Sequence, residues 1–515
     1  MTSVVSIDAL ALAPVLAPAA GAAATLVADV IAPRVRAATH LAVGAVALVI
    51  GIAFTFPGAL GSPGAPVRTL CRPAPDGACF YEAGPLASAL QLGALASALV
   101  VLLLVWPHRR DEEPGGLQGG PAVVVALVLS ATAGAAAVAA AHDLGSWLVA
   151  LELATLPAIA LVALRGTTAA GAGAISLLTT SLVSFAMVVL GGALWLVATG
   201  QAVFSRGAVD EALRAPETRA ILVLGVLLLV GGLGFKLSLV PFHTWTPQAY
   251  AGGSEAVAAF LAATSKIAAL AALLVVLRPL ADASAPVLVA IGVLAAVTMT
   301  VGNVLALVQD DPVRLLAWST VAQAGWVVLP LAALVTDGLV ASGGYLLAYA
   351  IATLVAFSVV TAVSHSAAER VVPVGTVTPH SADRSAAGDW PPAGRSLAAY
   401  RGLLRRSPAL GAALGLALLS LAGLPPGVVG LVAKVLALRP VVSEGLWALA
   451  LVAVANAVIG IAVYLRWFAL LLQDPGPDTA PVPRPAPGPA AALALTATAL
   501  VLTSLAPQLL LGLLD

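Results

Sequence analysis

The sequence predicts an all-α polytopic membrane protein with about fourteen transmembrane helices, of which helices seven and twelve are broken. Three observations support this fold class. Hydrophobic residues make up 61% of the 515-residue chain, only 9% are charged, and the mean hydropathy is +1.05. A soluble domain has roughly 25% charged residues. Apolar stretches long enough to cross a bilayer follow one another along the chain, and in two of them, 220–245 and 407–437, prolines are expected to break the helix.

The expected spans follow from the rule that about 20 apolar residues cross the hydrocarbon core of a bilayer. The first stretch has no basic segment before it and no cleavage site, so we expect a spanning helix rather than a signal peptide. The expected spans are 8–31, 40–58, 86–106, 121–141, 145–164, 173–198, 220–245, 254–279, 285–308, 314–335, 339–364, 407–437, 443–471 and 489–513.

Prolines interrupt two of these spans. Pro241 lies in the seventh span, and "GLPPG" at 423–427 lies in the twelfth. Proline removes a backbone donor and clashes with the preceding turn, so both helices are expected to break. Broken helices at matching places of two halves predict inverted repeats with an ion path between them. The expected domains are 1–110 (helices one to three), 111–280 (first five-helix repeat), 281–475 (second five-helix repeat, with a cytoplasmic loop at 366–405) and 476–515 (C-terminal helix).

The arginines and cysteines predict the orientation. With the N-terminus outside, fourteen arginines fall in inner loops and seven in outer loops, which places both termini on the non-cytoplasmic side. Cys71 and Cys79 then share an outer loop, where a disulfide is expected, with two free thiols as the alternative. Two cysteines are too few for a four-thiolate iron–sulfur cluster. The sequence has no basic surface pattern for nucleic acid and no nucleotide-binding glycine loop.

The lysines are the main indication of function. Only three of the 24 basic residues are lysines, Lys236, Lys266 and Lys434, and all three lie within apolar spans, whereas the arginines lie in loops or near span ends. A charge at the bilayer centre costs at least about 2.5–3.5 kcal/mol, so such residues usually have a function. Arginine stays charged, but a buried lysine can exist as an ammonium or an amine. Snorkelling to the interface is the alternative, and it is strongest for Lys434.

An acidic partner is expected for these lysines. Glu152, in "SWLVALELATLPA", is the only carboxylate in the body of its span. At about 7 Å and an effective dielectric near 20, a glutamate and a lysine attract each other by roughly 2.4 kcal/mol, enough to change proton affinity. A static ion pair is the alternative. His243, after Pro241, is a candidate proton relay or a structural hydrogen-bond donor to freed backbone.

Several segments resemble the antiporter-like proton-pumping membrane subunits of respiratory complex I, the NADH-quinone oxidoreductase, and among them the subunit N family. The resemblance covers about residues 120–470. The segments are "GFKLSLVPFHTWTPQAY" at 234–250, "SK" at 265–266, "RLLAWSTVAQAGW" at 314–326, "LSLAGLPPGVVGLVAK" at 419–434 and "ANAVIGIAVYLRWF" at 455–468.

The resemblance implies a role for each matching residue. Glu152, Lys236 and Lys266 correspond to the family's proton-transferring residues of helices five, seven and eight, and Lys434 to the one on the exit side in helix twelve. Two positions depart from the family pattern: Gln248 replaces an aspartate and Val313 replaces a lysine, which questions local proton uptake or loop contacts.

Ser319, Thr320, Gln323 and Asn456 are expected to order water or pack helices, and Asp29 to be interfacial.

The expected function is proton translocation in a bacterial inner-membrane complex, driven by quinone reduction elsewhere. This chain is then a translocase subunit without a redox centre, and NADH, FMN, iron–sulfur clusters and quinone belong to partner subunits. The resemblance implies neighbours similar to subunits K and M, within the lipid bilayer. A subunit of a multi-subunit cation/proton antiporter or of a membrane-bound hydrogenase is the alternative.

Overall fold

The structure, a computed structural model, describes residues 5–32, 36–62, 64–73, 77–106, 119–281, 287–371, 395–475, 482 and 484–514. Within these residues, thirteen helical segments are long and apolar enough to cross a membrane, and α18 (Pro408–Ala422) is a shorter apolar helix. The predicted fold class, an all-α polytopic membrane protein, is therefore confirmed. Most of the predicted loop 366–405 lies outside the described residues, since 372–394 are not among them.

The first part of the chain, up to the middle of the molecule, contains α1 (Ala13–Ile31), α2 (Ala37–Ala53), α3 (Phe56–Ala59), β1 (Val67–Cys71), β2 (Cys79–Ala83), α4 (Pro85–Leu104), α5 (Gly120–Ala140), α6 (Leu144–Leu153), α7 (Leu156–Ala163), α8 (Thr168–Thr199), α9 (Arg206–Arg214), α10 (Pro216–Leu237), α11 (Trp245–Gly252), α12 (Glu255–Ala262), α13 (Thr264–Leu277) and η1 (Arg278–Leu280). The second part contains α14 (Val287–Leu307), α15 (Pro312–Val328), η2 (Leu329–Ala333), α16 (Thr336–Val371), η3 (Leu397–Tyr400), α17 (Leu403–Arg406), α18 (Pro408–Ala422), α19 (Val428–Ser443), α20 (Trp447–Leu472), α21 (Pro487–Leu505) and α22 (Gln508–Leu511).

Every predicted span coincides with one or more helices, and several of the spans are interrupted. In the seventh span α10 ends at Leu237, earlier than the predicted end at 245, and the chain becomes helical again at Trp245. In the twelfth span the interruption lies between α18 and α19. The fifth and eighth spans are also divided, between α6 and α7 and between α12 and α13, which the sequence analysis did not predict.

Local chemistry explains three of the interruptions. Pro157, in the first turn of α7, has no amide hydrogen to continue the α6 hydrogen-bond ladder. Ser238 ends α10 in the left-handed conformation, with φ of 66°. Gly423 ends α18 with φ of 79°, a region that glycine enters without steric cost, and two prolines follow it. The interruption at Ala263 has no proline or glycine, and nothing in its own sequence explains it.

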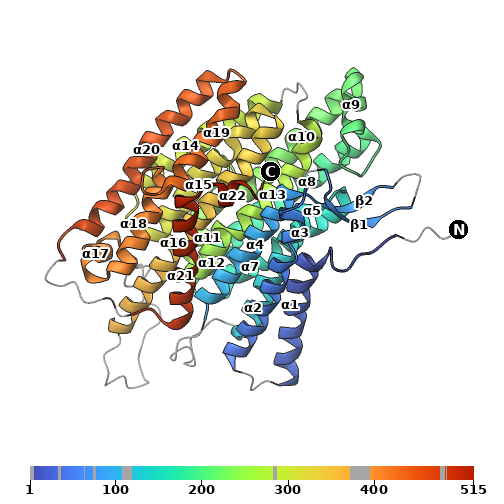
Figure 1. The fold of residues 1–515 in the computed structure, drawn as a ribbon. Helices are drawn as coiled ribbons and strands as arrows, with labels where there is room; N and C mark the ends of the chain where they lie inside the picture. The colour runs from blue at the N-terminus through green and yellow to red at the C-terminus, as the bar shows by residue number, and fades with distance from the viewer. Residues whose placement is uncertain are drawn as a thin grey trace.

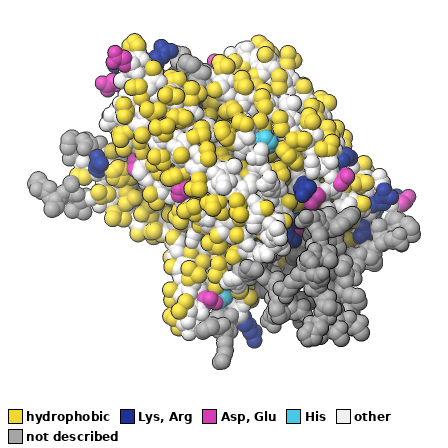
Figure 2. Space-filling view, turned by 180° about the vertical axis from the view of Figure 1, so that it is seen from behind, with side chains coloured by type: hydrophobic (Ala, Val, Ile, Leu, Met, Phe, Trp, Pro, Cys, Tyr) yellow, Lys and Arg dark blue, Asp and Glu magenta, His cyan; other side chains and the backbone are white. Residues whose placement is uncertain are grey.

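The helices divide into a central group and a peripheral group. Of the best spanning windows, 94% of the residues are buried in Pro312–Ala333 and Thr336–Ser364, against 28% in α1 and 33% in α8, α20 and α21. Figure 1 shows α1 and α2 on one side of the bundle and α20 on the other. Apolar side chains cover most of the face in Figure 2, and the basic ones gather at its edges. The peripheral helices thus have the apolar surface that lipid or neighbouring membrane subunits require.

A two-stranded antiparallel sheet marks one end of the bundle, which we call the hairpin end. Strands β1 and β2 pair from Val67 opposite Ala83 to Cys71 opposite Cys79, and these cysteines form the disulfide that the sequence analysis expected. Tyr81 forms a bridge with Ala141, so the sheet is attached to the loop between α5 and α6. The end of the bundle that carries α17 and the turn between α11 and α12 is called the opposite end (Figure 1).

Candidate functional site

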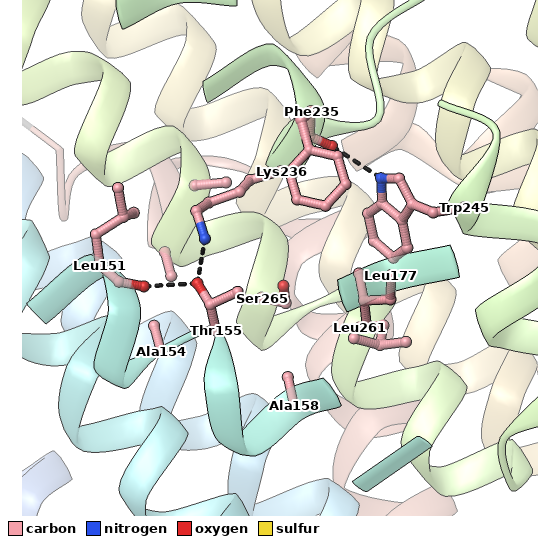
Figure 3. Close-up of a pocket in the computed structure, with 12 residues that line it drawn as sticks. Leu151, Ala154, Thr155, Ala158, Leu177, Phe235, Lys236, Trp245, Leu261 and Ser265 are labelled. Atoms are coloured by element: carbon pink, nitrogen blue, oxygen red, sulfur yellow. Dashed lines mark hydrogen bonds between the residues drawn. The ribbon is translucent and has the colours of Figure 1, made fainter. Parts of the chain in front are cut away.

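A small cavity lies between three of the interrupted helices. Its lining includes Thr155 from the turn between α6 and α7, Lys236 from the last turn of α10, Trp245 from α11 and Ser265 from α13 (Figure 3). The cavity volume is about 20 Å³, which is enough for one water molecule. The site predicted around Lys236 therefore combines a cationic side chain with a small space whose lining is mostly apolar, with Thr155 and Ser265 as its other polar side chains.

Lys236 has two polar partners on the fifth span. Its Nζ donates a hydrogen bond to Thr155 Oγ1 and lies 3.6 Å from Glu152 Oε1. The side chains are 8% and 19% exposed for Lys236 and Glu152. At an effective dielectric near 20, charges at this separation attract each other by about 4–5 kcal/mol, more than expected from the sequence. The 3.6 Å contact is longer than a hydrogen bond, so Thr155 is the direct partner of the ammonium and Glu152 its counter-ion.

Lys266 lies next to the backbone of Lys236 and has only neutral partners among the described residues. Its Nζ donates to the backbone oxygen of Lys236, at 2.8 Å, and to Ser238 Oγ. The ammonium also lies 4.7 Å from the centre of the Trp245 ring. Ser238 shares a second hydrogen bond with Thr246, on the other side of the interruption. Lys266 is only 1% exposed, so it is held at the interruption itself and away from lipid.

Lys434 repeats this arrangement in the second broken helix. Its Nζ donates to the backbone oxygens of Leu421, at 3.0 Å, and Ala422, at 2.6 Å, which are the last residues of α18. The residue is 7% exposed, and its Nζ lies 5.6 Å from the centre of the Trp326 ring. Lys434 is therefore directed into the break, and snorkelling to the interface does not describe its position.

The ammonium groups of Lys266 and Lys434 each bind the C-terminal end of another half-helix, α10 and α18 respectively. The last carbonyl groups of a helix have no intrahelical partner and carry the negative end of the helix dipole. A cation at such an end is stabilised by about 0.3–1 kcal/mol at a surface and up to about 2 kcal/mol when partly buried. The interruptions of α10 and α18 thus supply the backbone oxygens that hold the two lysines.

A network of amide and hydroxyl groups from α15, α16 and α20 leads toward Lys434. Gln323, on α15, accepts a hydrogen bond from Tyr345 and donates to Tyr464 Oη at 2.8 Å and to the Leu421 oxygen at 3.4 Å. The Leu421 oxygen is also a partner of Lys434. Gln323 and Tyr345 border a second cavity of about 10 Å³.

Two further hydroxyl contacts lie along α15. Ser319 Oγ lies 2.6 Å from Tyr464 Oη, and Thr320 Oγ1 lies 2.8 Å from Tyr349 Oη. Hydroxyl groups both donate and accept hydrogen bonds, so they can pass a proton along such a row. Within the described residues no hydrogen bond joins Lys266 directly to the network. Tyr250, on α11, which packs against α15, has a buried hydroxyl that lies near Thr320.

The remaining predicted residues, His243, Asn456 and Asp29, lie outside the contacts of the three lysines and of the hydroxyl network. The ring of His243 packs against Trp318 with centroids 5.4 Å apart, and its Nδ1 is buried without a hydrogen-bond partner in the described parts of the chain. Asn456 binds Thr300 and Asn303, so it joins α20 to α14. Asp29 is about half exposed and lies 3.5 Å from His40.

Sequence reasoning missed the neutral groups of the site. Thr155 and Ser238 are direct lysine partners, and Tyr345, Tyr349 and Tyr464 make most of the network. The signal available for Thr155 was its place one turn after Glu152 and two residues before a proline. In the described part of the chain, no group of three His, Cys, Asp or Glu side chains could hold a metal ion.

Comparison with known proteins relates this arrangement to a family. A family model described as NADH:quinone oxidoreductase/Mrp antiporter, transmembrane, matches residues 141–460. NADH-quinone oxidoreductase subunit N 2 of Streptomyces griseus is 35% identical over 98% of this chain and 92% of its own length. Subunit N of Salinispora tropica is 37% identical over 93% of this chain and 88% of its own length.

Solved structures have the same fold. A chain of respiratory complex I from Thermus thermophilus matches with a TM-score of 0.76 and 28% identity, over 97% of this chain and 98% of that one. A chain of the Mrp complex from a Dietzia species matches with a TM-score of 0.76 and 21% identity, over 98% and 96%. The second match concerns the fold alone.

Proposed function

Because the chain belongs to the subunit N family of NADH-quinone oxidoreductases, we propose that it carries protons across the membrane through Glu152, Lys236, Lys266 and Lys434. The observation that supports this most directly is the burial of all three lysines at interruptions of the helices. A buried ammonium is costly in a membrane protein unless the charge has a function.

The proposed sequence of transfers follows the contacts. Lys236 exchanges protons near Glu152 and Thr155, and Lys266 lies next in line because it binds the backbone oxygen of Lys236. In this proposal Thr320 and Tyr349 pass protons to the network of Gln323 and Tyr464, which contacts the Leu421 oxygen that binds Lys434. Tyr250 lies between these two parts and is the proposed link, and His243 is a second candidate relay.

The energy for transport comes, in this proposal, from quinone reduction elsewhere in a complex. The relatives are named as subunits of NADH-quinone oxidoreductase. NADH, FMN, the iron–sulfur clusters and the quinone are therefore assigned to partner subunits, with neighbours similar to subunits K and M. We place the protein in a bacterial inner membrane, with the hairpin end and both termini on the non-cytoplasmic side. The two five-helix repeats at 111–280 and 281–475 remain part of this proposal.

Proton pumping in membranes tests the proposal. Lys236→Ala is expected to leave the assembled complex in the membrane and to reduce NADH-driven pumping about 100-fold or more, the lower end of the contribution typical of a proton-transfer group. Lys236→Arg is expected to fail as well, because arginine keeps its proton. Normal pumping by an assembled Lys236→Ala complex would contradict the proposal. Proton transport that persists without NADH and quinone would favour an antiporter instead.

A further inference from the structure

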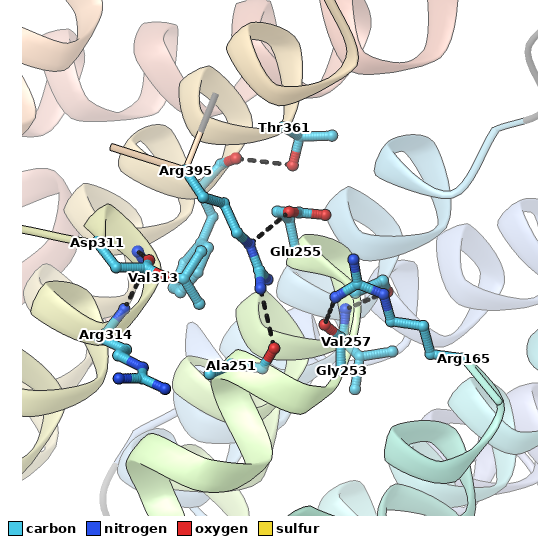
Figure 4. A network of polar contacts seen from close by, with 12 residues as sticks. Arg165, Ala251, Gly253, Glu255, Val257, Asp311, Val313, Arg314, Thr361 and Arg395 are labelled. Atoms are coloured by element: carbon cyan, nitrogen blue, oxygen red, sulfur yellow. Dashed lines mark hydrogen bonds and ion pairs between the residues drawn. The ribbon is translucent and has the colours of Figure 1, made fainter. Parts of the chain in front are cut away.

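A buried ion pair lies at the opposite end of the bundle, away from Lys236, Lys266 and Lys434. Arg395 Nε lies 3.2 Å from Glu255 Oε1, and the two side chains are only 4% and 11% exposed. Arg395 Nη1 also donates to the backbone oxygen of Ala251 at 2.9 Å (Figure 4). Taking both charges out of water is costly, so a pair this deeply buried requires a close geometry to persist.

Further charged and polar groups surround the pair. Arg165, between α7 and α8, donates to the Gly253 oxygen at 2.7 Å, so two arginines bind the turn between α11 and α12 (Figure 4). Burial lowers the pKa of Arg165, an effect that nearby Glu255 partly offsets and Arg395 increases. Burial, with Glu255 and Asp311 nearby, raises the pKa of Tyr400. The charge of Glu255 therefore influences the pKa of both Arg165 and Tyr400.

The turn that the arginines bind belongs to one structural unit, the α11–α12 segment, residues 245–262. The segment is bounded by the interruption before Trp245 and by the interruption at Ala263. Its base contacts the lysine site: Trp245 donates to the Phe235 oxygen at 3.0 Å, and its ring faces Lys266. Because both ends are interruptions, a shift at the turn reaches the base without unwinding a continuous helix.

The partner of Glu255 comes from the second half of the chain. Arg395 begins the stretch 395–407 that leads into α18, whose last carbonyl groups hold Lys434. The stretch is also attached to the start of α15, because Leu397 donates to the Asp310 oxygen at 2.8 Å. Glu255 is the only carboxylate of the α11–α12 segment, in which Gln248 replaces the aspartate of the family pattern.

We propose that Glu255 and Arg395 form a positioning pair that couples the α11–α12 segment, and through it Lys266, to the stretch that leads to Lys434. The pair does not carry the proton. The attraction between Glu255 and Arg395 fixes the position of the α11–α12 segment. That position in turn determines how Trp245 and Ser238 contact Lys266. Arg395 Nη2 is buried without an acceptor in the described part of the chain, so the guanidinium has a donor available for a second arrangement. This inference rests on the proposed proton-transfer function.

The test uses the complete complex in inverted membrane vesicles. Glu255→Gln and Arg395→Gln each break the pair and are expected to leave the amount of assembled complex within about twofold of native, while pumping per assembled complex falls about fivefold, as for other coupling residues. Glu255→Asp keeps the charge and is expected to restore at least about half of the pumping. The exchange of the two residues, Glu255→Arg with Arg395→Glu, is expected to do the same.

A matched control separates a coupling role from a structural one. Asp474→Asn breaks the exposed Arg405–Asp474 pair at the same end of the bundle and is expected to pump normally, since exposed pairs contribute little. The inference is wrong if Glu255→Gln pumps at the native rate per assembled complex, or if its loss of pumping merely follows loss of the complex. Lys236→Ala, measured in parallel, reports separately on the proton-transfer function itself.

Discussion

Each buried lysine of this protein has a different set of partners. Lys236 has a carboxylate at 3.6 Å and a threonine hydroxyl, whereas Lys266 and Lys434 bind carbonyl and hydroxyl oxygens and face tryptophan rings. Carbonyl and hydroxyl oxygens accept hydrogen bonds from an amine as well as from an ammonium. The sites of Lys266 and Lys434 therefore accommodate both protonation states, while the state of Lys236 is linked to the charge of Glu152.

Thr155 decides how tightly Lys236 and Glu152 interact. Valine has nearly the shape of threonine but no hydroxyl, so Thr155→Val leaves Glu152 as the polar side-chain partner of Lys236 among the described residues. The ammonium is then expected to stay with the carboxylate, and NADH-driven pumping in vesicles is expected to fall about 5- to 10-fold, equivalent to the loss of about one hydrogen bond.

The control for this prediction is Thr155→Ser, which keeps the hydroxyl and is expected to pump almost as fast as the native protein. Assembly is measured on the same membranes by native gel electrophoresis. If the valine variant assembles and pumps like the serine variant, then Thr155 has no role in proton transfer.

At the scale of the helices, the interruptions are the functional elements. The last carbonyl groups of α10 and α18 bind Lys266 and Lys434, and the interruption of the fifth span brings Glu152 and Thr155 to Lys236. A continuous helix uses its carbonyl groups for its own hydrogen bonds and has none to offer a lysine. Each of the three lysines therefore depends on a place where the helix ladder stops.

Gly423 tests the importance of the interruption in the twelfth span. Its φ is 79°, and a Cβ added there would lie 2.9 Å from Lys434 Cδ. Gly423→Ala is expected to destabilise the local backbone by about 1–2 kcal/mol, to move Lys434 and to reduce pumping about 10-fold.

Gly445→Ala is the matched control for this substitution. Gly445 has a φ of 72°, but no atom lies within 4 Å of its added Cβ, so the backbone strain is similar and no lysine is touched. Thermal unfolding of the purified complex measures the strain, and vesicle assays measure pumping. Equal pumping by the two variants would exclude a specific effect on Lys434.

At the scale of the whole molecule, the charged residues and the disulfide define two different ends. The hairpin end carries the sheet and the Cys71–Cys79 disulfide, and the opposite end carries the exposed Arg405–Asp474 pair. The proposed orientation, with the hairpin end on the non-cytoplasmic side, agrees with the oxidising conditions in which disulfides persist.

Thiol labelling tests this orientation. After mild reduction, Cys71 and Cys79 are expected to react with a membrane-impermeant maleimide in right-side-out vesicles but not in inverted ones. A variant with both cysteines replaced by serine and Asp474→Cys is expected to show the reverse pattern, because Asp474 is exposed at the other end. Labelling of both sites from the same side would contradict the topology.

The sequence by itself determined the transmembrane spans, the fold class, the burial of the three lysines and the interruptions at the proline-rich places. These features depend on short stretches of chain: a run of apolar residues partitions into lipid, and a proline or a left-handed glycine favours an interruption of the helix through its own backbone chemistry. The span prediction therefore needed no knowledge of neighbouring helices.

Only the tertiary structure decided which groups meet. Thr155 and Lys236 are 81 residues apart in sequence, Gln323 and Tyr464 are 141 apart, and Glu255 and Arg395 are 140 apart. The interruption at Ala263 likewise has no local signal. Such contacts depend on how several helices pack against one another, and a single hydroxyl or carboxylate adds too little to the local pattern to reveal its distant partner.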